Sequence, residues 1–468
     1  MSETEALFTV LRQSSDPDCA AAIEGSVREA SDRELCRVNV LAFAAKHGLD
    51  EERTIAAYLH ASRLGLFELS WNVLCPGCGG VLDAGATLKN VNRDEYDCAL
   101  CASGYKATLD EMVEVTFTVS PRVRRITAHN PDDLSEVEYY RQMFWSSGVA
   151  LPETLGESLA EFTVDSIELP PGEKAVLSVQ LPAEFVIVFD PVTHGTQFID
   201  VKGEPTRERQ TLTMVFNNVK APVGTIEMRP GPLRLSLDNQ TGRRVLPALW
   251  IAADPLHRLL GNRRPFLTAK RLLTNQTFRD IYRTDTLDVD QRLKITSLTF
   301  LFTDLKGSTA LYERVGDLVA YDLVRQHFHI LYEVVSAEAG AVVKTIGDAV
   351  MATFQTPDRA LAAALRMREE MTRINAERKN EDLLLKIGIH EGPCLAVTLN
   401  NSQDYFGQTV NMAARVQGLA SSRAIFVTKS VVDDEKSAKI LETSGLHPMM
   451  QRAALRGIAD ETTVYEIP

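Results

Sequence analysis

The sequence lacks long apolar segments and an excess of basic residues. No apolar run approaches the roughly 20 residues that a membrane-spanning helix needs, and the run Phe185–Phe189 has only the length of a strand. Acidic residues outnumber basic ones, 63 to 50, and the formal net charge is −13. Binding to nucleic acid or to an anionic membrane surface requires clustered Lys and Arg. These absences argue against a nucleic-acid partner and against a membrane partner.

The first residues lack the features of a secretory signal. The start, Met1-Ser2-Glu3-Thr4-Glu5, is acidic and has no apolar core segment. The seven cysteines are an odd number, and four of them form two C-x-x-C pairs. Such pairs are typical of metal binding in a reducing compartment, not of a disulfide framework. We therefore expect a cytoplasmic protein.

The length and composition are those of an ordinary multidomain protein. The chain has 468 residues, of which 45% are apolar and 24% charged. At about 150 residues a domain, this length allows about three domains. Several well-buried cores are expected.

The paired cysteines predict a metal site. Nineteen residues separate the two pairs, and a glycine follows the second cysteine of the first pair. Each pair can supply two thiolates to one tetrahedral ion, and this spacing matches the four-cysteine zinc pattern. We predict a structural Zn²⁺, without catalysis, in a zinc ribbon at residues 71–120. The predicted ligands are Cys75, Cys78, Cys98 and Cys101.

Two further segments precede and follow this ribbon. Residues 1–70 are predicted to be helical, because apolar residues recur with a helical period in Val38–Ala45 and Asp50 can cap a following helix. No basic recognition face accompanies the pattern, so a module of three or four packed helices is preferred over a helix-turn-helix unit. Residues 121–265 are predicted to be β-rich, with alternating strands at 177–181 and 233–237. A sandwich or small barrel of unknown role is expected there.

A helical linker is predicted between these segments and the last domain. Residues 266–293 follow Pro265, which suits the first position of a helix. A weak apolar face runs through Leu267, Phe278 and Ile281. We interpret the segment as a helical transducer.

Residues 294–468 show an α+β pattern. A continuous apolar strand is predicted at 298–302, and a helix with one apolar face follows it. A hairpin is predicted around Gly347-Asp348, then a helix from about residue 358 and a strand at 384–390. This alternation is typical of a sheet with helices packed on it. The helix face consists of Val324, Phe328, Leu331 and Val335.

Two carboxylates in this domain lie at glycine-marked turns next to apolar strands. Asp304 is followed by Lys306-Gly307-Ser308-Thr309, and Asp348 follows Gly347. Carboxylates at strand ends can hold divalent metal ions. The free N–H groups of a glycine-marked loop that opens a helix can bind phosphates. The pattern predicts a site for Mg²⁺ and a triphosphate.

Several motifs in the same order identify the domain as similar to a known family. Residues 302–309, 344–348 and 404–415 together resemble the catalytic domain of class III nucleotidyl cyclases. The resemblance implies a ferredoxin-like α+β fold and two Mg²⁺ (or Mn²⁺) ions in each active site. It implies metal ligation by Asp304, the carbonyl of Leu305, and Asp348. The resemblance also implies that Gly307, Ser308 and Thr309 bind the phosphates. Lys306 is assigned no role.

The resemblance also assigns residues to the base, the ribose and the phosphates. Lys344 can donate to adenine N1, and Asp404 can accept from the 6-amino group. Asn411 is expected to orient the ribose and Arg415 to stabilise charge on the transferring phosphate; they are four residues apart and share a helix face. Arg456 occupies a position where the family usually has a triphosphate-binding Lys.

The implied activity is conversion of ATP to 3′,5′-cyclic AMP and pyrophosphate. The metal residues and the Asn/Arg residues belong to opposite halves of the family's composite site, so the resemblance implies a head-to-tail homodimer. The N-terminal part resembles an uncharacterised region found ahead of such domains, and no regulatory ligand or partner is indicated. Three alternatives stay open: a cyclase using GTP or a pyrimidine triphosphate, a degenerate domain acting as a nucleotide sensor or scaffold, and a zinc-ribbon regulator of nucleic acid.

Overall fold

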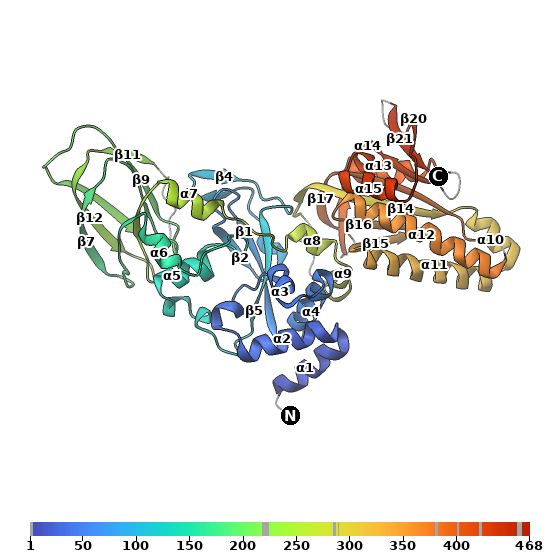
Figure 1. Ribbon diagram of the computed structural model, residues 1–468, viewed down its shortest axis with the longest axis horizontal. Coiled ribbons are helices and arrows are strands. Elements are labelled where there is room, and N and C mark those ends of the chain that lie inside the picture. Colours follow the sequence, from blue (N-terminus) through green and yellow to red (C-terminus); the bar gives the residue numbers. More distant parts are fainter. Residues whose placement is uncertain are drawn as a thin grey trace. The chain divides into compact units, whose positions relative to one another are not determined.

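The computed structural model describes residues 3–217, 224–283, 287–288, 290–379, 382–399, 402–420, 424–455 and 461–468, and the side chain of Thr309 lies outside this description. The chain divides into two compact units (Figure 1). Unit 1 comprises Met1–Ala107 and Glu111–Leu267. Unit 2 comprises Thr108–Asp110 and Thr268–Pro468. The five-segment division drawn from the sequence stays a prediction.

Four helices open unit 1. They are α1 (Glu3–Ser14), α2 (Pro17–Glu29), α3 (Val40–His47) and α4 (Glu51–Arg63), with a short 3₁₀ turn, η1 (Asp32–Leu35), between α2 and α3. The side chain of Asn39 caps α3, and Gly48, with φ of +65°, ends it. Asp50 caps α4 as its sequence position predicts. Leu11 and Ile23 are fully buried between these helices, so the expected helical module is present.

The cysteine pairs lie on a small sheet and a hairpin. Strands β1 (Phe67–Leu74), β2 (Val81–Gly85) and β5 (Val113–Val119) form an antiparallel sheet in the order β2-β1-β5. The short strands β3 (Tyr96–Cys98) and β4 (Ser103–Tyr105) pair with each other, and a 3₁₀ turn, η2 (Leu88–Asn90), precedes them. One cysteine pair follows β1, and the other spans the turn of the β3–β4 hairpin.

The β-rich character predicted for residues 121–265 begins only at residue 163, and the first part of the segment does not share it. It contains only helices and turns up to residue 160: η3 (Thr127–His129), η4 (Pro131–Asp133), α5 (Glu136–Tyr139), the π-helix η5 (Tyr140–Phe144) and α6 (Leu155–Ala160). The aromatic residues here pack against Trp250, which is distant in sequence; the rings of Tyr140 and Trp250 have centroids 5.2 Å apart. This tertiary packing favours a conformation that local alternation does not reveal.

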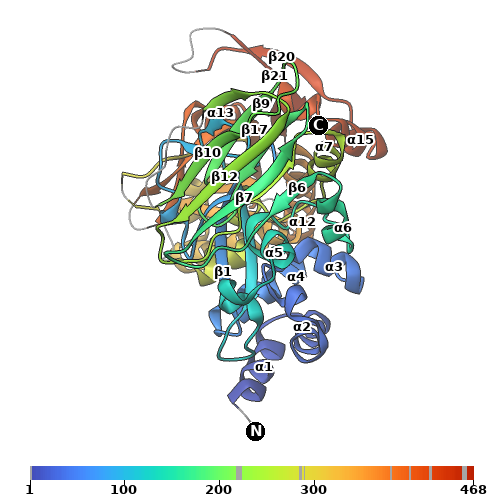
Figure 2. The ribbon, with the colours of Figure 1, turned by 90° about the vertical axis from the view of Figure 1, so that its left-hand side faces the viewer.

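The rest of the segment is the expected sandwich. Its strands are β6 (Thr163–Ser166), β7 (Lys174–Leu181), β8 (Phe185–Phe189), β9 (Thr196–Val201), β10 (Gln210–Phe216), β11 (Thr225–Met228), β12 (Gly231–Asn239) and β13 (Ala248–Ile251). One sheet has the order β10-β12-β7 and the other β11-β9-β8-β13-β6. Figure 2 shows the three-stranded sheet toward the viewer. Leu235 and Leu237 of one sheet and Val186 and Ile199 of the other share one buried core. Helix α7 (Asp254–Gly261) follows.

Unit 2 begins with two short helices, α8 (Ala269–Leu273) and α9 (Gln276–Ile281). The predicted helix start at Pro265 is wrong. The side chain of Thr268 caps α8 and the side chain of Asn275 caps α9. Each capping side chain accepts a hydrogen bond from one of the free amides of a helix start, so the polypeptide begins a new helix after each of these residues.

A large sheet forms the centre of unit 2. Its strands are β14 (Leu293–Leu305), β15 (Gly340–Ile346), β16 (Ala349–Phe354), β17 (Leu385–Leu399), β18 (Ser402–Phe406), β19 (Ile425–Thr428), β20 (Met449–Ala453) and β21 (Thr462–Ile467). The order is β15-β16-β14-β17-β19-β21-β20, and β18 pairs with β17. The helices are α10 (Ser308–Val315), α11 (Asp317–Ala337), α12 (Pro357–Arg378), α13 (Gln408–Gln417), α14 (Lys429–Val432) and α15 (Glu435–Thr443).

Helices cover both faces of this sheet. Leu331 of α11 and Met367 of α12 share a buried core with Ile425 of β19. Val416 of α13 packs instead with Phe426, the next residue of β19. Because successive strand residues point to opposite faces, α13 lies on the other side of the sheet from α11 and α12.

The second strand of the predicted closing pair is β21, as expected, and its partner in the structure is β20, Met449–Ala453. Of the first predicted strand, residues 455–458, all but Leu455 lie outside the described residues. Arg456 lies outside the described residues.

Within the described ranges, every helix is too short or too polar to cross a bilayer.

Candidate active site

Asp304 lies near the end of the central strand β14. This strand pairs with β16 on one side and with β17 on the other. Lys386 stands opposite Asp304 on β17, and its Nζ is 3.5 Å from Asp304 Oδ2. After the buried Leu305, Gly307 with φ of +71° turns the chain into α10. The left-handed conformation of this residue explains why a glycine opens the predicted phosphate loop.

Asp348 lies in the tight turn between β15 and β16. Gly347 precedes it with φ of +64°. The register pairs Thr303 with Val350, so one antiparallel step further brings Asp304 beside the hairpin turn that carries Asp348. Sequence alone suggested two separate glycine-marked turns, and the sheet brings them to one edge.

The surroundings of Asp348 suit a cation. Its Oδ2 is buried and has no hydrogen-bond partner among the described residues. His327 of α11, fully buried, lies beside it; burial lowers the pKa of His327 to about 4, and the interactions with Asp348 oppose this shift. A buried carboxylate oxygen without a partner is costly, and oxygen donors are the ligands that Mg²⁺ prefers. The two carboxylates therefore fit a divalent ion.

Lys344 and Asp404 form an ion pair. Lys344 lies on β15 and Asp404 on β18, 60 residues away, yet Lys344 Nζ is 2.5 Å from Asp404 Oδ2. Asp404 is 7% exposed and also accepts a hydrogen bond from the backbone N–H of Tyr405. A donor and an acceptor for a polar base edge thus lie side by side.

Helix α13 carries the other two predicted polar residues. Asn411 is exposed and Arg415 half-buried. No ion pair or hydrogen bond within the described ranges engages the Arg415 guanidinium. Among the described residues, no ion pair or hydrogen bond joins Asn411 or Arg415 to Asp304 or Asp348. The residues assigned to the two half-sites are therefore not joined within one chain.

Helix α13 is positioned by a glycine, Gly388, that the sequence analysis did not single out. A Cβ on Gly388 of β17 would lie 2.1 Å from the backbone N of Gln417 and 2.4 Å from its Cα. Only a residue without a side chain permits such an approach. Lys386 was also missed, because it lies in an otherwise apolar stretch that predicts only a strand, and so was His327, because its surroundings predict only a helix.

The four predicted zinc ligands form one cluster in unit 1. All four Sγ atoms lie within 4.8 Å of one another. Cys75 Sγ is 3.7 Å from Cys101 Sγ, and Cys78 Sγ is 3.6 Å from Cys98 Sγ. Thiolates about 2.3 Å from a tetrahedral Zn²⁺ stand about 3.8 Å apart. The sulfurs therefore fit that ion, and the backbone N–H of Gly80 donates to Cys78 Sγ at 3.4 Å.

Two family models match the chain. Residues 1–280 match a family of unknown function, DUF5939, and residues 291–462 match the adenylate and guanylate cyclase catalytic domain. An adenylate cyclase of Anabaena cylindrica is 26% identical over 185 residues, which are 36% of this chain and 36% of that protein. Adenylate cyclase 2 of Rhizobium meliloti is 34% identical over 132 residues, 26% of this chain and 36% of that protein.

A solved structure is similar over the same region. The adenylyl cyclase CyaB from P. aeruginosa is 19% identical, with a TM-score of 0.33, over 38% of this chain and 96% of that one. The chain spans only about a third of the two curated relatives above. The resemblance to the class III cyclases, and to an uncharacterised region ahead of them, is confirmed. The chain belongs to the DUF5939 family, and its residues 291–462 are an adenylate and guanylate cyclase catalytic domain.

Proposed function

We propose that this protein is an adenylate cyclase that converts ATP to 3′,5′-cyclic AMP and pyrophosphate as a head-to-tail homodimer. The observation that carries the proposal is the Lys344–Asp404 ion pair, 2.5 Å long. It lies in the same domain as two carboxylates gathered at one sheet edge.

The carboxylates account for metal binding. Asp304, Asp348 and the carbonyl of Leu305 would hold two Mg²⁺ or Mn²⁺ ions. When bound, such ions acidify the ribose 3′-OH and neutralise the triphosphate. The amides of the turn through Gly307 and Ser308 lie at the start of α10 and would donate to the phosphates.

The Lys344–Asp404 pair accounts for the choice of base. Adenine offers an acceptor, N1, next to a donor, the 6-amino group, and the pair provides a donor next to an acceptor. Guanine presents the opposite pattern on that edge, so the ammonium would face a donor and the carboxylate an acceptor. Recognition sites reject such mismatches strongly because a buried polar group is left unpaired. ATP is therefore favoured over GTP.

Helix α13 accounts for the transferring phosphate. A guanidinium is always charged and presents a planar fork of donors. Arg415, whose side chain has no polar partner among the described residues, is available to stabilise charge that develops in the transition state. Asn411, one turn earlier, would orient the ribose.

Exposed apolar side chains support the dimer. Leu318 is 81% exposed and Tyr321 60% exposed near the start of α11, and Phe406 is 64% exposed at the end of β18. Large apolar side chains in water are often covered by a partner. A second copy of the chain would also bring Asn411 and Arg415 to the carboxylates.

Product identification tests the reaction. The full chain is incubated with ATP, GTP, CTP and UTP together, first with Mg²⁺ and then with Mn²⁺, and the products are identified by mass spectrometry. Asp348→Ala is run beside it, with Asp433→Ala, an exposed carboxylate of the same domain, as the matched control. We expect cyclic AMP from the wild type and the control, and none from Asp348→Ala. Cyclic GMP as the main product would refute the assignment of the base, and no cyclic product would favour a nucleotide sensor.

Mixing two inactive variants tests the dimer. Asp304→Ala and Arg415→Ala should each abolish activity. A heterodimer of the two has one site with both substitutions and one with neither, so random pairing should restore about a quarter of the wild-type activity. If the mixture stays inactive although subunits exchange, the composite site is refuted.

We further infer that Cys75, Cys78, Cys98 and Cys101 hold a structural Zn²⁺. All four positions of a tetrahedral ion would be taken by thiolates, which leaves none for a substrate. Metal analysis of protein purified without chelator should find about one zinc per chain. Well under one would overturn the assignment.

A further inference from the structure

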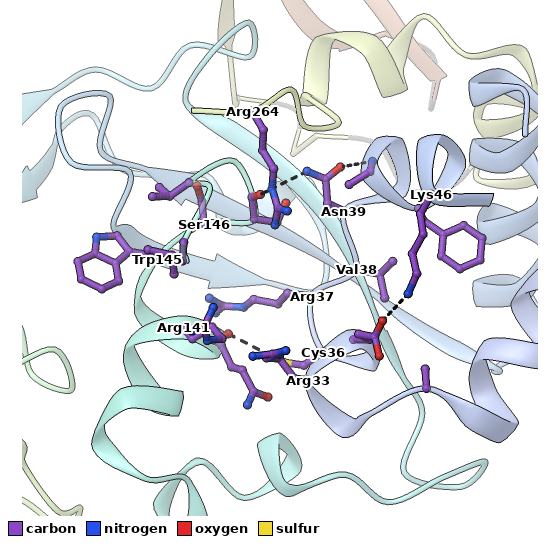
Figure 3. Close-up of a pocket in the computed structure, with 18 of the residues that line it drawn as sticks. Arg33, Cys36, Arg37, Val38, Asn39, Lys46, Arg141, Trp145, Ser146 and Arg264 are labelled. Atoms are coloured by element: carbon purple, nitrogen blue, oxygen red, sulfur yellow. Dashed lines mark hydrogen bonds and ion pairs between the residues drawn. The ribbon is translucent and has the colours of Figure 1, made fainter. Parts of the chain in front are cut away.

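Unit 1 contains a cavity that the cyclase reaction does not use. It has a volume of about 300 Å³ and lies between η1, α3, the π-helix η5 and the segment around residues 145–153 (Figure 3). This volume is at the lower end of the range for small-molecule sites, roughly 300–1,000 Å³. Every lining residue belongs to unit 1.

The lining is rich in cations. Arg33, Arg37 and Arg141 lie in the lower part of Figure 3, and Arg264 enters from above. Together with Lys46 they make five cations, against two lining carboxylates, Glu34 and Glu153, which is an excess of three positive charges (five minus two). A wall with this excess attracts an anion.

The arginines are only partly neutralised. Arg33 pairs with Glu153 at 2.7 Å, and Glu153 is 80% exposed in its side chain. Arg141 has Glu138 at 3.6 Å. Burial lowers the pKa of Arg141 and the neighbouring Arg33 lowers it further, whereas Glu138 and Glu153 oppose this shift. Like charges held close together are destabilising unless a counter-anion lies between them.

The remaining two arginines lack a carboxylate within ion-pair distance among the described residues. Arg37 donates to the carbonyl of Met143, and Arg264 donates to the carbonyl of Ser147 at 2.6 Å. The fully buried Glu114 interacts electrostatically with both Arg37 and Arg264, and burial raises the pKa of Glu114. The guanidinium groups of Arg37 and Arg264 have further N–H donors that can bind a ligand.

Two buried polar atoms of lining residues also lack partners, although the Nε2 of Gln142 donates to Glu138 Oε2 at 2.6 Å. Ser146 is 3% exposed and Gln142 is 7% exposed. The hydroxyl of Ser146 and the Oε1 of Gln142 make no hydrogen bond with described residues. A buried hydroxyl or amide oxygen without a partner costs free energy, so each is expected to find one in the functional state. Ser146 supplies a donor, and Gln142 Oε1 requires a donor from the ligand.

The backbone around the cavity is unusual at two places. Arg37 has φ of +45°, a left-handed conformation that non-glycine residues rarely adopt. Arg141 and Gln142 lie on the π-helix η5 (Tyr140–Phe144). π-helices are rare and are frequently found at functional sites. Apolar residues, including Val38 and Phe43, complete the lining.

We propose that this cavity binds a small hydroxylated phosphate monoester. The guanidinium groups suit a dianionic phosphate, because their forks match its oxygens and the wall carries excess positive charge. The unpartnered Gln142 Oε1 accepts from a ligand hydroxyl, which a simple dicarboxylate does not have. The proposal does not depend on cyclase activity.

Binding to the full chain tests the proposal. Ribose 5-phosphate, inorganic phosphate and succinate are titrated calorimetrically at one fixed ionic strength, because screening weakens such contacts. Ribose 5-phosphate should bind most tightly and succinate least. Succinate binding as tightly as the phosphates would overturn the ligand class. Absence of binding by all three to millimolar concentration would overturn the site.

Variants locate the binding. Arg33→Gln and Arg141→Gln should each weaken binding of ribose 5-phosphate about tenfold or more, the loss expected for a hydrogen bond to a charged group. Arg28→Gln removes an arginine of α2 that has a similar ion pair, with Glu24, and does not line the cavity. It should bind like the wild type. Equal binding by Arg33→Gln and the wild type would overturn the location.

A third variant should strengthen binding instead of weakening it, so its effect cannot be explained by misfolding. Glu153→Gln removes the exposed partner of Arg33 without creating a buried charge. Binding of ribose 5-phosphate should become about 1.4- to fivefold tighter, because surface ion pairs contribute about 0.2–1 kcal/mol. Weaker binding by a folded Glu153→Gln protein would contradict the proposal even if Arg141→Gln fails to fold.

Discussion

The close approach of α13 to β17 gives the sharpest structural prediction. In Gly388→Ala the new methyl would lie 2.1 Å from Gln417 N, whereas ordinary contacts begin at 3.4 Å. The difference, 3.4 minus 2.1, requires a displacement of about 1.3 Å. Both nearest atoms are backbone, so no side-chain rotation relieves the contact. Helix α13, which carries Arg415 two residues earlier, must move.

Such a shift should lower both stability and activity. Overpacking of this kind typically costs about 1–3 kcal/mol. Misplacing a catalytic group by about 1 Å costs about a hundredfold in rate. We therefore expect Gly388→Ala to lower the thermal midpoint of the cyclase domain by several degrees. Formation of cyclic AMP should fall about a hundredfold, mainly through kcat.

The assay compares matched glycines. Gly25→Ala, in α2, places a methyl where nothing lies within 4 Å, so its activity should equal that of the wild type, and its melting temperature should be equal or slightly higher because alanine favours a helix interior over glycine. Both proteins are tested for melting by circular dichroism and for cyclic AMP formation at saturating ATP. Unchanged melting and unchanged activity of Gly388→Ala would refute the argument that this glycine positions the helix.

Three further predictions concern charge, metal and pH. Lys344→Met should lower kcat/KM for ATP about 10- to 100-fold, since it leaves the mostly buried carboxylate of Asp404 unpaired. The control Lys439→Met, at an exposed lysine, should leave kcat/KM unchanged. Equal losses of kcat/KM for ATP and GTP in Lys344→Met would count against a role in base choice. Cys98→Ser should lose the proposed zinc and lower the melting temperature of unit 1, whereas Cys19→Ser, outside the cluster, should keep it. Retention of a full zinc equivalent by Cys98→Ser would be inconsistent with four-thiolate ligation. Burial lowers the pKa of His390 from 6.5 to about 4, so the unfolded chain binds a proton below pH 6.5 that the folded chain does not. The contribution of His390 to the free energy of unfolding should therefore fall by up to about 3 kcal/mol as the pH drops from 6.5 to 4, and His327 adds a slope of the same sign. In denaturant titrations His390→Gln should flatten that slope, and an identical slope would show that another group is responsible.

Local chemistry explains why much of the catalytic domain is predictable. Asp348 in a glycine turn, or Asn411 and Arg415 four residues apart, are patterns that require only a few neighbouring residues. The spacing of apolar residues that marks a strand or a helix also depends only on neighbouring residues. For this reason α11, the β15–β16 hairpin and α13 lie where the sequence predicts. The two cysteine pairs predict their own cluster because a C-x-x-C turn already arranges two thiolates.

Other features required the tertiary structure. The Lys344–Asp404 contact joins residues 60 positions apart, and the helical segment at residues 127–160 follows from aromatic packing against a distant Trp250. The cavity combines Arg33, Arg141 and Arg264, residues more than a hundred positions apart in sequence. No local period or motif marks such residues, because only chain folding brings their charges together. The sequence by itself identified the catalytic family and predicted its carboxylates. The structure decided which distant side chains share a site, since that depends on long-range packing and not on neighbouring residues.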